Sequence, residues 1–215
     1  MKKVSLILSA AVITAMMLSS CGGSSYKEVK IGNQVWMAEN LNVEKFRNGD
    51  PIPHANTLAK WRKAGQEGKP AWCYYDNDPA NGKIYGKLYN WYAVSDWRGL
   101  APEGWRIPSD ADWSKLVKLL GGRRVAGGKL KSTDTTYWTS PNTAATNETG
   151  FTALPGGFGG GNDAFDYIGN YGYWWSATES RAGYPRIWGV HYDSGFVDSE
   201  NGGKEGGLSV RCIKD

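Results

Sequence analysis

The stretch from Ser109 to Leu120 alternates apolar and polar residues with the period of an α-helix. Its apolar positions fall on one face, which carries Trp113, Leu116, Val117 and Leu120. Ser109 stands at the N-cap, and Asp112 completes a short capping box. Gly121 follows and can adopt the left-handed conformation that ends a helix. The pattern therefore predicts a helix over 109–120 that packs its apolar face on the core.

Alternation with a period of two predicts the strands. The runs 28–31 and 34–37 flank Gly32-Asn33 and predict a hairpin. Alternation also places Tyr173 and Trp175 on one face of a strand and Trp174 on the other. Short runs of apolar and aromatic residues between turn residues predict further strands over 71–75, 151–154, 173–178, 187–192, 195–198 and 208–213.

Shorter apolar patterns predict additional helical segments over 57–64, 85–94 and 125–130. The acidic run 76–82 could be the front half of a calcium loop or a turn rich in Asp and Asn. Pro79 interrupts the run and no Glu closes it, which favours the turn. The long loop 156–172 contains four aromatic residues, which is typical of an ordered, functional loop.

Composition narrows the class of protein. The 215 residues include 29 Gly, 11 Trp and 12 Tyr but only 5 Phe, which predicts a loop-rich α+β domain with a core built from indoles. The charges nearly balance, with 25 Lys and Arg against 21 Asp and Glu, and no basic run suggests a nucleic-acid partner. His54 and His191 have no motif partner, so neither a metal nor a cofactor is expected.

The first residues read as an export signal rather than as part of a fold. Lys2 and Lys3 precede the uncharged run 4–18, which is too short for a membrane-spanning helix. The end of this run, Leu18-Ser19-Ser20-Cys21, resembles a bacterial lipobox, in which the cysteine becomes the lipidated N-terminus. An ordinary signal peptide with a chance cysteine is the alternative. We expect a signal peptide over 1–20, a lipid-anchored tether over 21–27 and one domain over 28–215.

Two cysteines remain in the exported chain, Cys73 and Cys212. An oxidising compartment permits a disulfide between them, but their spacing alone does not show that they meet. Both outcomes, a disulfide and two free thiols, stay open at this point.

Several short motifs together resemble the Fibrobacter succinogenes major paralogous domain family, which is common in exported proteins of that phylum and of Bacteroidetes. The resemblance covers nearly the whole exported chain and rests on the segments 31–42, 85–91, 101–109, 150–157, 172–176 and 209–212. It implies a C-type-lectin-like fold related to formylglycine-generating enzymes: a twisted antiparallel sheet with two main helices and long glycine-rich loops. Many members have a cysteine where this chain has Ala101. If that cysteine forms a disulfide in them, Cys212 here pairs with Cys73 or stays free.

The resemblance implies a fold and a cellular location, but the family has no established reaction. We expect a non-catalytic lipoprotein of the outer membrane, on its periplasmic or outer face, that binds a glycan or a protein. Structural or assembly lipoproteins that contact partner proteins are the alternative. The reactive cysteine pair of a formylglycine-generating enzyme is missing, and a glycosidase would have to use Asp163 and Asp166. The candidate ligand-binding residues lie in and after the long loop: Asn162, Asp163, Asp166, Tyr167, Tyr171, Trp174, Glu179, Arg181 and Trp188.

Overall fold

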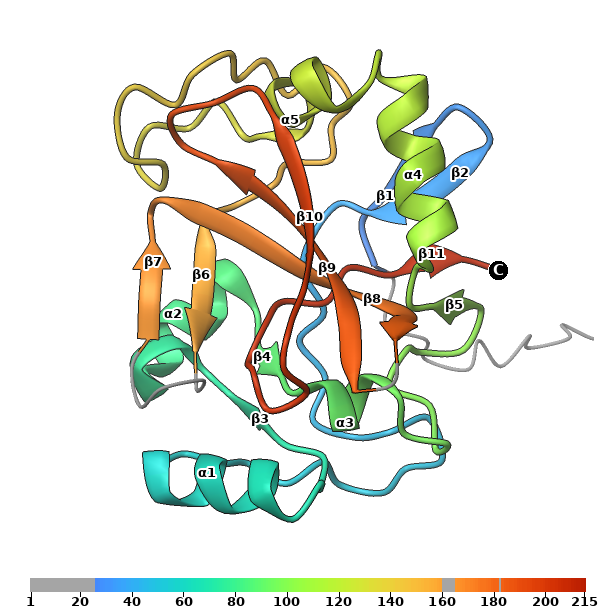
Figure 1. Ribbon diagram of the computed structural model, residues 1–215, viewed down its shortest axis with the longest axis vertical. Helices are drawn as coiled ribbons and strands as arrows, with labels where there is room; N and C mark the ends of the chain where they lie inside the picture. Colours follow the sequence, from blue (N-terminus) through green and yellow to red (C-terminus); the bar gives the residue numbers. More distant parts are fainter. Residues whose placement is uncertain (1–25, 160–164, 182) are drawn as a thin grey trace, which may run out of the picture.

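A computed structural model describes residues 26–159, 165–181 and 183–215 of the protein (Figure 1). The predicted residues Cys21, Asn162 and Asp163 lie outside this part of the chain. The helices are α1 (Leu58–Gln66), α2 (Pro79–Tyr85), α3 (Trp91–Val94), α4 (Asp110–Leu119) and α5 (Arg123–Leu130). The strands are β1 (Glu28–Ile31), β2 (Gln34–Met37), β3 (Trp72–Cys73), β4 (Leu88–Tyr89), β5 (Trp105–Arg106), β6 (Gly156–Gly159), β7 (Phe165–Ile168), β8 (Tyr171–Arg181), β9 (Tyr184–His191), β10 (Val197–Asn201) and β11 (Ile213–Lys214).

The strands form two main sheets, which confirms an α+β fold. One sheet has the order β1-β2-β11-β5, so that strands from the beginning and the end of the domain pair with each other. The other has the order β10-β9-β8-β6-β7 and is twisted, with the long strand β8 near its middle (Figure 1). The short pair β3-β4 lies apart from both. None of the helices in the described ranges is long and apolar enough to cross a bilayer.

Helix α4 forms as the sequence predicts. The Ser109 hydroxyl accepts a hydrogen bond from the Asp112 amide, and the Asp112 carboxylate accepts one from the Ser109 amide, so the capping box is complete. Asp112 also forms two hydrogen bonds with Arg106, of 2.6 and 2.9 Å. These bonds, above all those with Arg106, lower the pKa of Asp112 to about 2. The predicted apolar face is buried: Trp113, Leu116, Val117 and Leu120.

The core is built from indoles on both faces of β8. Trp174 packs in one buried cluster with Trp113, whose ring lies 6.1 Å from its own, and with Trp36. Its neighbour Trp175 packs in another cluster, with Tyr89 and Trp91. The predicted alternation is therefore correct, but both tryptophans are buried, since the sheet is covered on both sides at this point.

Several predicted elements differ in the structure. The helix expected over 85–94 shrinks to α3, because Gly86 adopts a φ of +77° and Leu88 and Tyr89 pair as a strand with β3. The segments 151–154 and 208–213 are mostly irregular: Ala153 makes a single bridge to Lys131, and Leu208 and Ser209 make single bridges to Tyr89 and Trp174. The acidic run holds a turn and then α2, whose N-cap is Asp78 and whose first residue is Pro79.

The expected loop 156–172 contains the paired strands β6 and β7 in its described part. Gly157 adopts a φ of +62°, and a Cβ there would lie 2.4 Å from the Asp166 carbonyl oxygen. The pairing of β6 with β7 therefore requires a glycine at this position. The aromatic side chains of the segment are therefore carried by strands rather than by an irregular loop.

Candidate functional site

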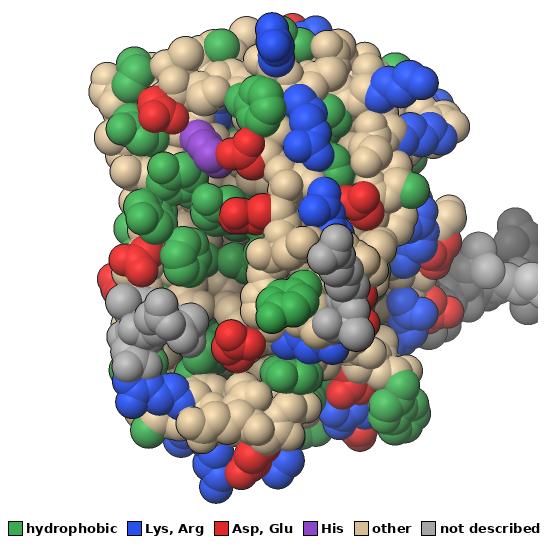
Figure 2. All heavy atoms as spheres, in the orientation of Figure 1, with side chains coloured by type: hydrophobic (Ala, Val, Ile, Leu, Met, Phe, Trp, Pro, Cys, Tyr) green, Lys and Arg blue, Asp and Glu red, His purple; other side chains and the backbone are tan. Residues whose placement is uncertain are grey.

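Five rings from neighbouring strands of the second sheet lie side by side on one surface of the molecule. We call this set the aromatic face; it consists of Phe158 from β6, Tyr167 from β7, Tyr171 and Tyr173 from β8, and His191 from β9. Figure 2 shows hydrophobic side chains gathered on this side, with a histidine and several acidic side chains among them. The face exists because residues two apart on β8 point to the same side of the sheet.

The rings form one continuous network of contacts. Tyr171 and Tyr173 are nearly parallel, with centroids 5.6 Å apart. Tyr167 stands edge-on to Tyr171 at 4.8 Å and contacts Phe158 at 5.6 Å. Tyr171 also contacts His191, edge to face, with centroids 4.5 Å apart. Tyr167 is half exposed, and the other rings of the face are only partly buried, so part of the network faces solvent.

Tyr167 has an unusual backbone. Its φ is +65°, in the left-handed region, where a bulky side chain is disfavoured by about 1–2 kcal/mol. The ring is 50% exposed, so burial offsets little of this strain. Strained residues of this kind concentrate at binding and catalytic sites, which makes Tyr167 a candidate functional residue.

Acidic side chains surround the face. His191 Nε2 lies 2.9 Å from the Asp198 carboxylate. Burial, followed by the carboxylate of Glu200, raises the pKa of Tyr173, and burial, followed by Asp193, raises the pKa of Tyr171. The face therefore combines flat apolar rings with hydrogen-bond acceptors at its edge.

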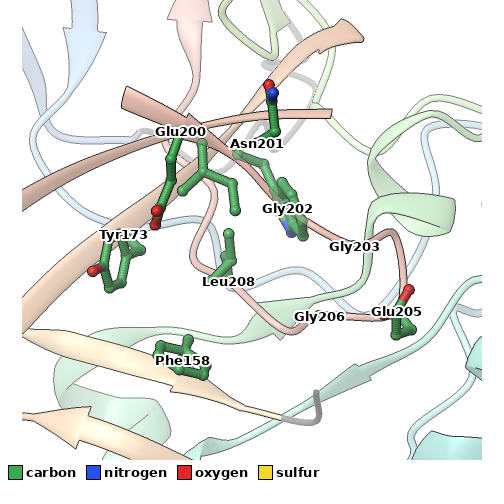
Figure 3. A pocket seen from close by; sticks show the side chains of 11 residues that line it. Phe158, Tyr173, Glu200, Asn201, Gly202, Gly203, Glu205, Gly206 and Leu208 are labelled. Carbon is green, nitrogen blue, oxygen red and sulfur yellow. The ribbon is translucent and has the colours of Figure 1, made fainter. Parts of the chain in front are cut away.

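Next to the face lies an open cavity of about 210 Å³, which we call the Glu200 cavity (Figure 3). Phe158 and Tyr173 belong to both the face and the cavity, so the two are continuous. Trp175, Ile187 and Leu208 complete its apolar lining, and β10 with the loop after it brings Glu200, Glu205 and three glycines. In Figure 3 the Glu200 side chain extends toward Tyr173, while Glu205 lies at the opposite end.

Lys131 supports the face from inside the protein. Its ammonium group donates hydrogen bonds to the carbonyl oxygens of Thr143, His191 and Ser194 at 2.8, 2.8 and 2.9 Å. Burial lowers the pKa of this lysine to about 8. These bonds fix the turn that follows β9 and hence the position of His191.

The structure separates the predicted ligand-binding residues into different groups. Tyr167 and Tyr171 lie on the aromatic face, and Asp166 is exposed next to Tyr167 on β7. Glu179 lies farther along β8 and pairs with Lys204 at 2.6 Å. Arg181 ends β8, and its side chain lies outside the described part of the structure.

The prediction is wrong for Trp174 and Trp188, which are each only 2% exposed. Trp188 stacks on Trp113 and donates its indole hydrogen bond to Asp110. Because these two side chains point away from the aromatic face into the core, neither can contact a ligand.

Sequence reasoning missed Phe158, Tyr173, Glu200 and Glu205 as site residues. The alternation along β8 was the available signal, since it puts Tyr171 and Tyr173 on the same side. Glu200 lies on β10 and Glu205 in the loop after it, and β10 reaches the site only through its pairing with β9.

A second set of rings and charges lies mainly in the core, with the partly buried Asn40 at its edge. Asn40 Oδ1 accepts hydrogen bonds from Arg211 at 2.8 and 3.1 Å and from the Trp174 indole at 2.8 Å. The Arg211 guanidinium also donates to the Phe151 carbonyl and lies 4.3 Å from the centre of that ring. We call these residues the Asn40 hub. Four of the motif segments identified in the sequence meet here: 31–42, 150–157, 172–176 and 209–212. Their contacts in the hub give these motifs a structural role.

Cys73 and Cys212 are both buried free thiols. They lie in different core clusters, and Cys212 shares its cluster with Ala101. The disulfide alternative is therefore wrong. Burial raises the pKa of Cys212 to about 12, which leaves it protonated and unreactive at neutral pH.

The remaining histidine, His54, stacks on Trp72 with centroids 3.8 Å apart. Burial lowers its pKa. In the described part of the chain, no three His, Cys, Asp or Glu side chains gather in a way that could hold a metal ion.

Comparison with known proteins identifies the family. Residues 29–214 match the family model described as the Fibrobacter succinogenes major domain. Because this match spans most of the sequence, the chain belongs to that family. No curated protein and no solved structure matches it. The family description names neither a ligand nor a reaction, so the ligand has to be inferred from the site.

Proposed function

We propose that this member of the Fibrobacter succinogenes major domain family is a non-catalytic binding module, and that its ligand is a glycan held on the aromatic face. Tyrosine rings give flat apolar surfaces on which the C–H face of a sugar ring can pack. The carboxylates at the edge accept hydrogen bonds from sugar hydroxyls. The observation that carries the proposal is the strained, half-exposed Tyr167 within this network of rings.

The proposal includes an anchor at Cys21. The lipobox-like segment before Cys21 supports lipidation, which would hold the module at the outer membrane. The pairing of β11 with β2 is in keeping with a C-type-lectin-like architecture, in which the ends of the domain meet. A structural lipoprotein that contacts partner proteins is the competing function.

Binding of oligosaccharides by the full-length chain, expressed with its own leader and purified in detergent from the membrane fraction, tests the proposal. We expect saturable binding of at least one neutral or amino-sugar oligosaccharide, and a loss of about tenfold or more in affinity for Tyr171→Ala. Trp97→Ala is the matched control, because Trp97 is 88% exposed and lies outside the aromatic face. Absence of binding to every oligosaccharide, or equal losses in both variants, would contradict the proposal. Recovery of the chain only from the soluble fraction would contradict the anchor.

A further inference from the structure

The Glu200 cavity has the chemistry of a site for a positively charged group. Its carboxylates, Glu200 and Glu205, have no hydrogen-bond or ion-pair partner for their side chains among the described residues. Nearby cations are engaged elsewhere: Lys204 pairs with Glu179 and lies over the Trp91 ring, and Arg186 bonds to Ser199 and Asp110. The cavity therefore combines uncompensated negative charge with an unfilled volume of about 210 Å³.

The rings of the cavity add to this preference. Phe158, Tyr173 and Trp175 line it together with Ile187 and Leu208. Aromatic faces attract cations through their quadrupole, and rings combined with carboxylates are the usual surroundings of an alkylammonium group in proteins. An anionic ligand would meet repulsion from both carboxylates.

The loop that carries Glu205 is held in place. Its Glu205 carbonyl oxygen accepts a hydrogen bond of 2.9 Å from the Trp61 indole. A Cβ on Gly202 would lie 2.2 Å from Ile187 Cδ1, so a larger residue here would have to displace the tip of that side chain. Glu200 lies on strand β10 and Glu205 on this loop, so the backbone that carries both carboxylates is held in position, which lowers the entropy cost of binding.

We infer that the Glu200 cavity binds the free amino group of an N-deacetylated amino sugar, while the adjoining sugar units lie on the aromatic face. This inference rests on the proposed glycan-binding function and adds the chemical class of the ligand. The shared residues Phe158 and Tyr173 connect the two parts of the site. The charged amine supplies the complement to Glu200, and the sugar rings supply the complement to the tyrosines.

Three β-1,4-linked tetrasaccharides of equal length test the inference in isothermal titration calorimetry with the detergent-solubilised full-length protein. They are the glucosamine tetramer, its fully N-acetylated counterpart and cellotetraose, which differ only in the group on carbon 2. We expect the free-amine tetramer to bind about tenfold or more tightly than the other two. This preference should shrink as salt is raised, since it is electrostatic.

Glu200→Gln should remove most of the preference for the free amine and leave binding of the neutral tetramers within about twofold, because it keeps the shape of the side chain but not its charge. The matched control is Glu103→Gln, which removes one exposed carboxylate outside the cavity and should leave the preference unchanged. Thermal unfolding of both variants checks that they fold.

The possible results distinguish the amine inference from the glycan-binding proposal. Equal affinity for all three tetramers, or a preference that survives Glu200→Gln, would overturn the amine inference and leave the glycan-binding proposal intact. Absence of binding to any of them, together with Glu200-dependent binding of a lysine-rich peptide, would overturn both and identify a peptide ligand.

Discussion

The Asn40 hub and the Glu200 cavity use the same kinds of side chain for opposite purposes. Both bring aromatic rings next to charged groups. In the hub, Arg211 has hydrogen-bond partners and is buried together with Trp174 and Phe151. In the cavity, the carboxylate of Glu200 faces Tyr173 with no cationic partner among the described residues. The core cluster and the candidate site therefore differ in whether the charge has a partner, and not in whether aromatic rings are present.

We expect the largest loss of stability from a substitution in the Asn40 hub. Asn40→Ala leaves the buried Arg211 with fewer acceptors and the Trp174 indole without one, so it should lower the free energy of unfolding by about 3–5 kcal/mol. Urea denaturation measures this loss. The matched control is Asn48→Ala in an exposed turn, which should change stability by no more than about 0.5 kcal/mol. Similar losses in both variants would show that the hub is not a special source of stability.

Substitutions of two adjacent residues on β8, Tyr173 and Trp174, should separate ligand binding from stability. Trp174→Phe removes an indole hydrogen bond and core volume, so we expect a loss of about 2 kcal/mol in unfolding free energy and little change in ligand affinity. Tyr173→Ala, on the opposite side of the strand, should cost about 1 kcal/mol of stability but weaken ligand binding by about tenfold. Parallel denaturation and calorimetry measure both quantities. If Trp174→Phe were the variant that lost affinity, the division between core face and ligand face would be wrong.

The Arg106–Asp112 pair at the start of α4 is intermediate between the hub and the cavity, since it is paired but partly exposed. The pKa of Asp112 is lowered to about 2, from an unfolded value near 4. Its contribution is therefore fully present above about pH 4 and is lost as the pH falls toward 2. After allowance for solvent screening we expect a loss of about 1–2 kcal/mol over this range. Asp112→Asn should remove this part of the pH dependence, and an unchanged acid transition would contradict the assignment.

The smallest effect concerns the strain at Tyr167. Tyr167→Gly and Tyr167→Ala both remove the ring, but only glycine relaxes at a φ of +65°. The glycine variant should therefore be more stable than the alanine variant by about 1 kcal/mol, while both lose ligand affinity. Thermal unfolding compares the two. Equal stabilities would mean that the backbone is not strained here.

The sequence predicted those elements whose signals are local. Helix α4 was predictable because its cap, its apolar face and its terminating glycine lie within one segment. The hairpin of β1 and β2 was predictable from the alternation around Gly32-Asn33. The helix expected over 85–94 failed because Leu88 and Tyr89 are held in β4 by distant partners in β3 and at Leu208.

The site was only partly predictable for the same reason. Tyr167 and Tyr171 were recognised as candidates because they lie in a segment rich in rings and glycine. Trp174 was assigned wrongly, because alternation shows that neighbouring residues face opposite sides but not which side is open. Glu200 and Glu205 reach the same cavity as Tyr173 only through the pairing of β8, β9 and β10, which one-dimensional patterns do not reveal.

A nuclear magnetic resonance titration tests directly whether an amino sugar binds on the aromatic face. It follows the tyrosine ring signals while an amino-sugar tetrasaccharide is added. We expect saturable chemical-shift changes for the rings of Tyr167, Tyr171 and Tyr173, and no change for Tyr89, which is fully buried. Saturable shifts confined to Tyr74, in the groove beside His54 and Trp72, would contradict it and move the binding site to that side of the molecule.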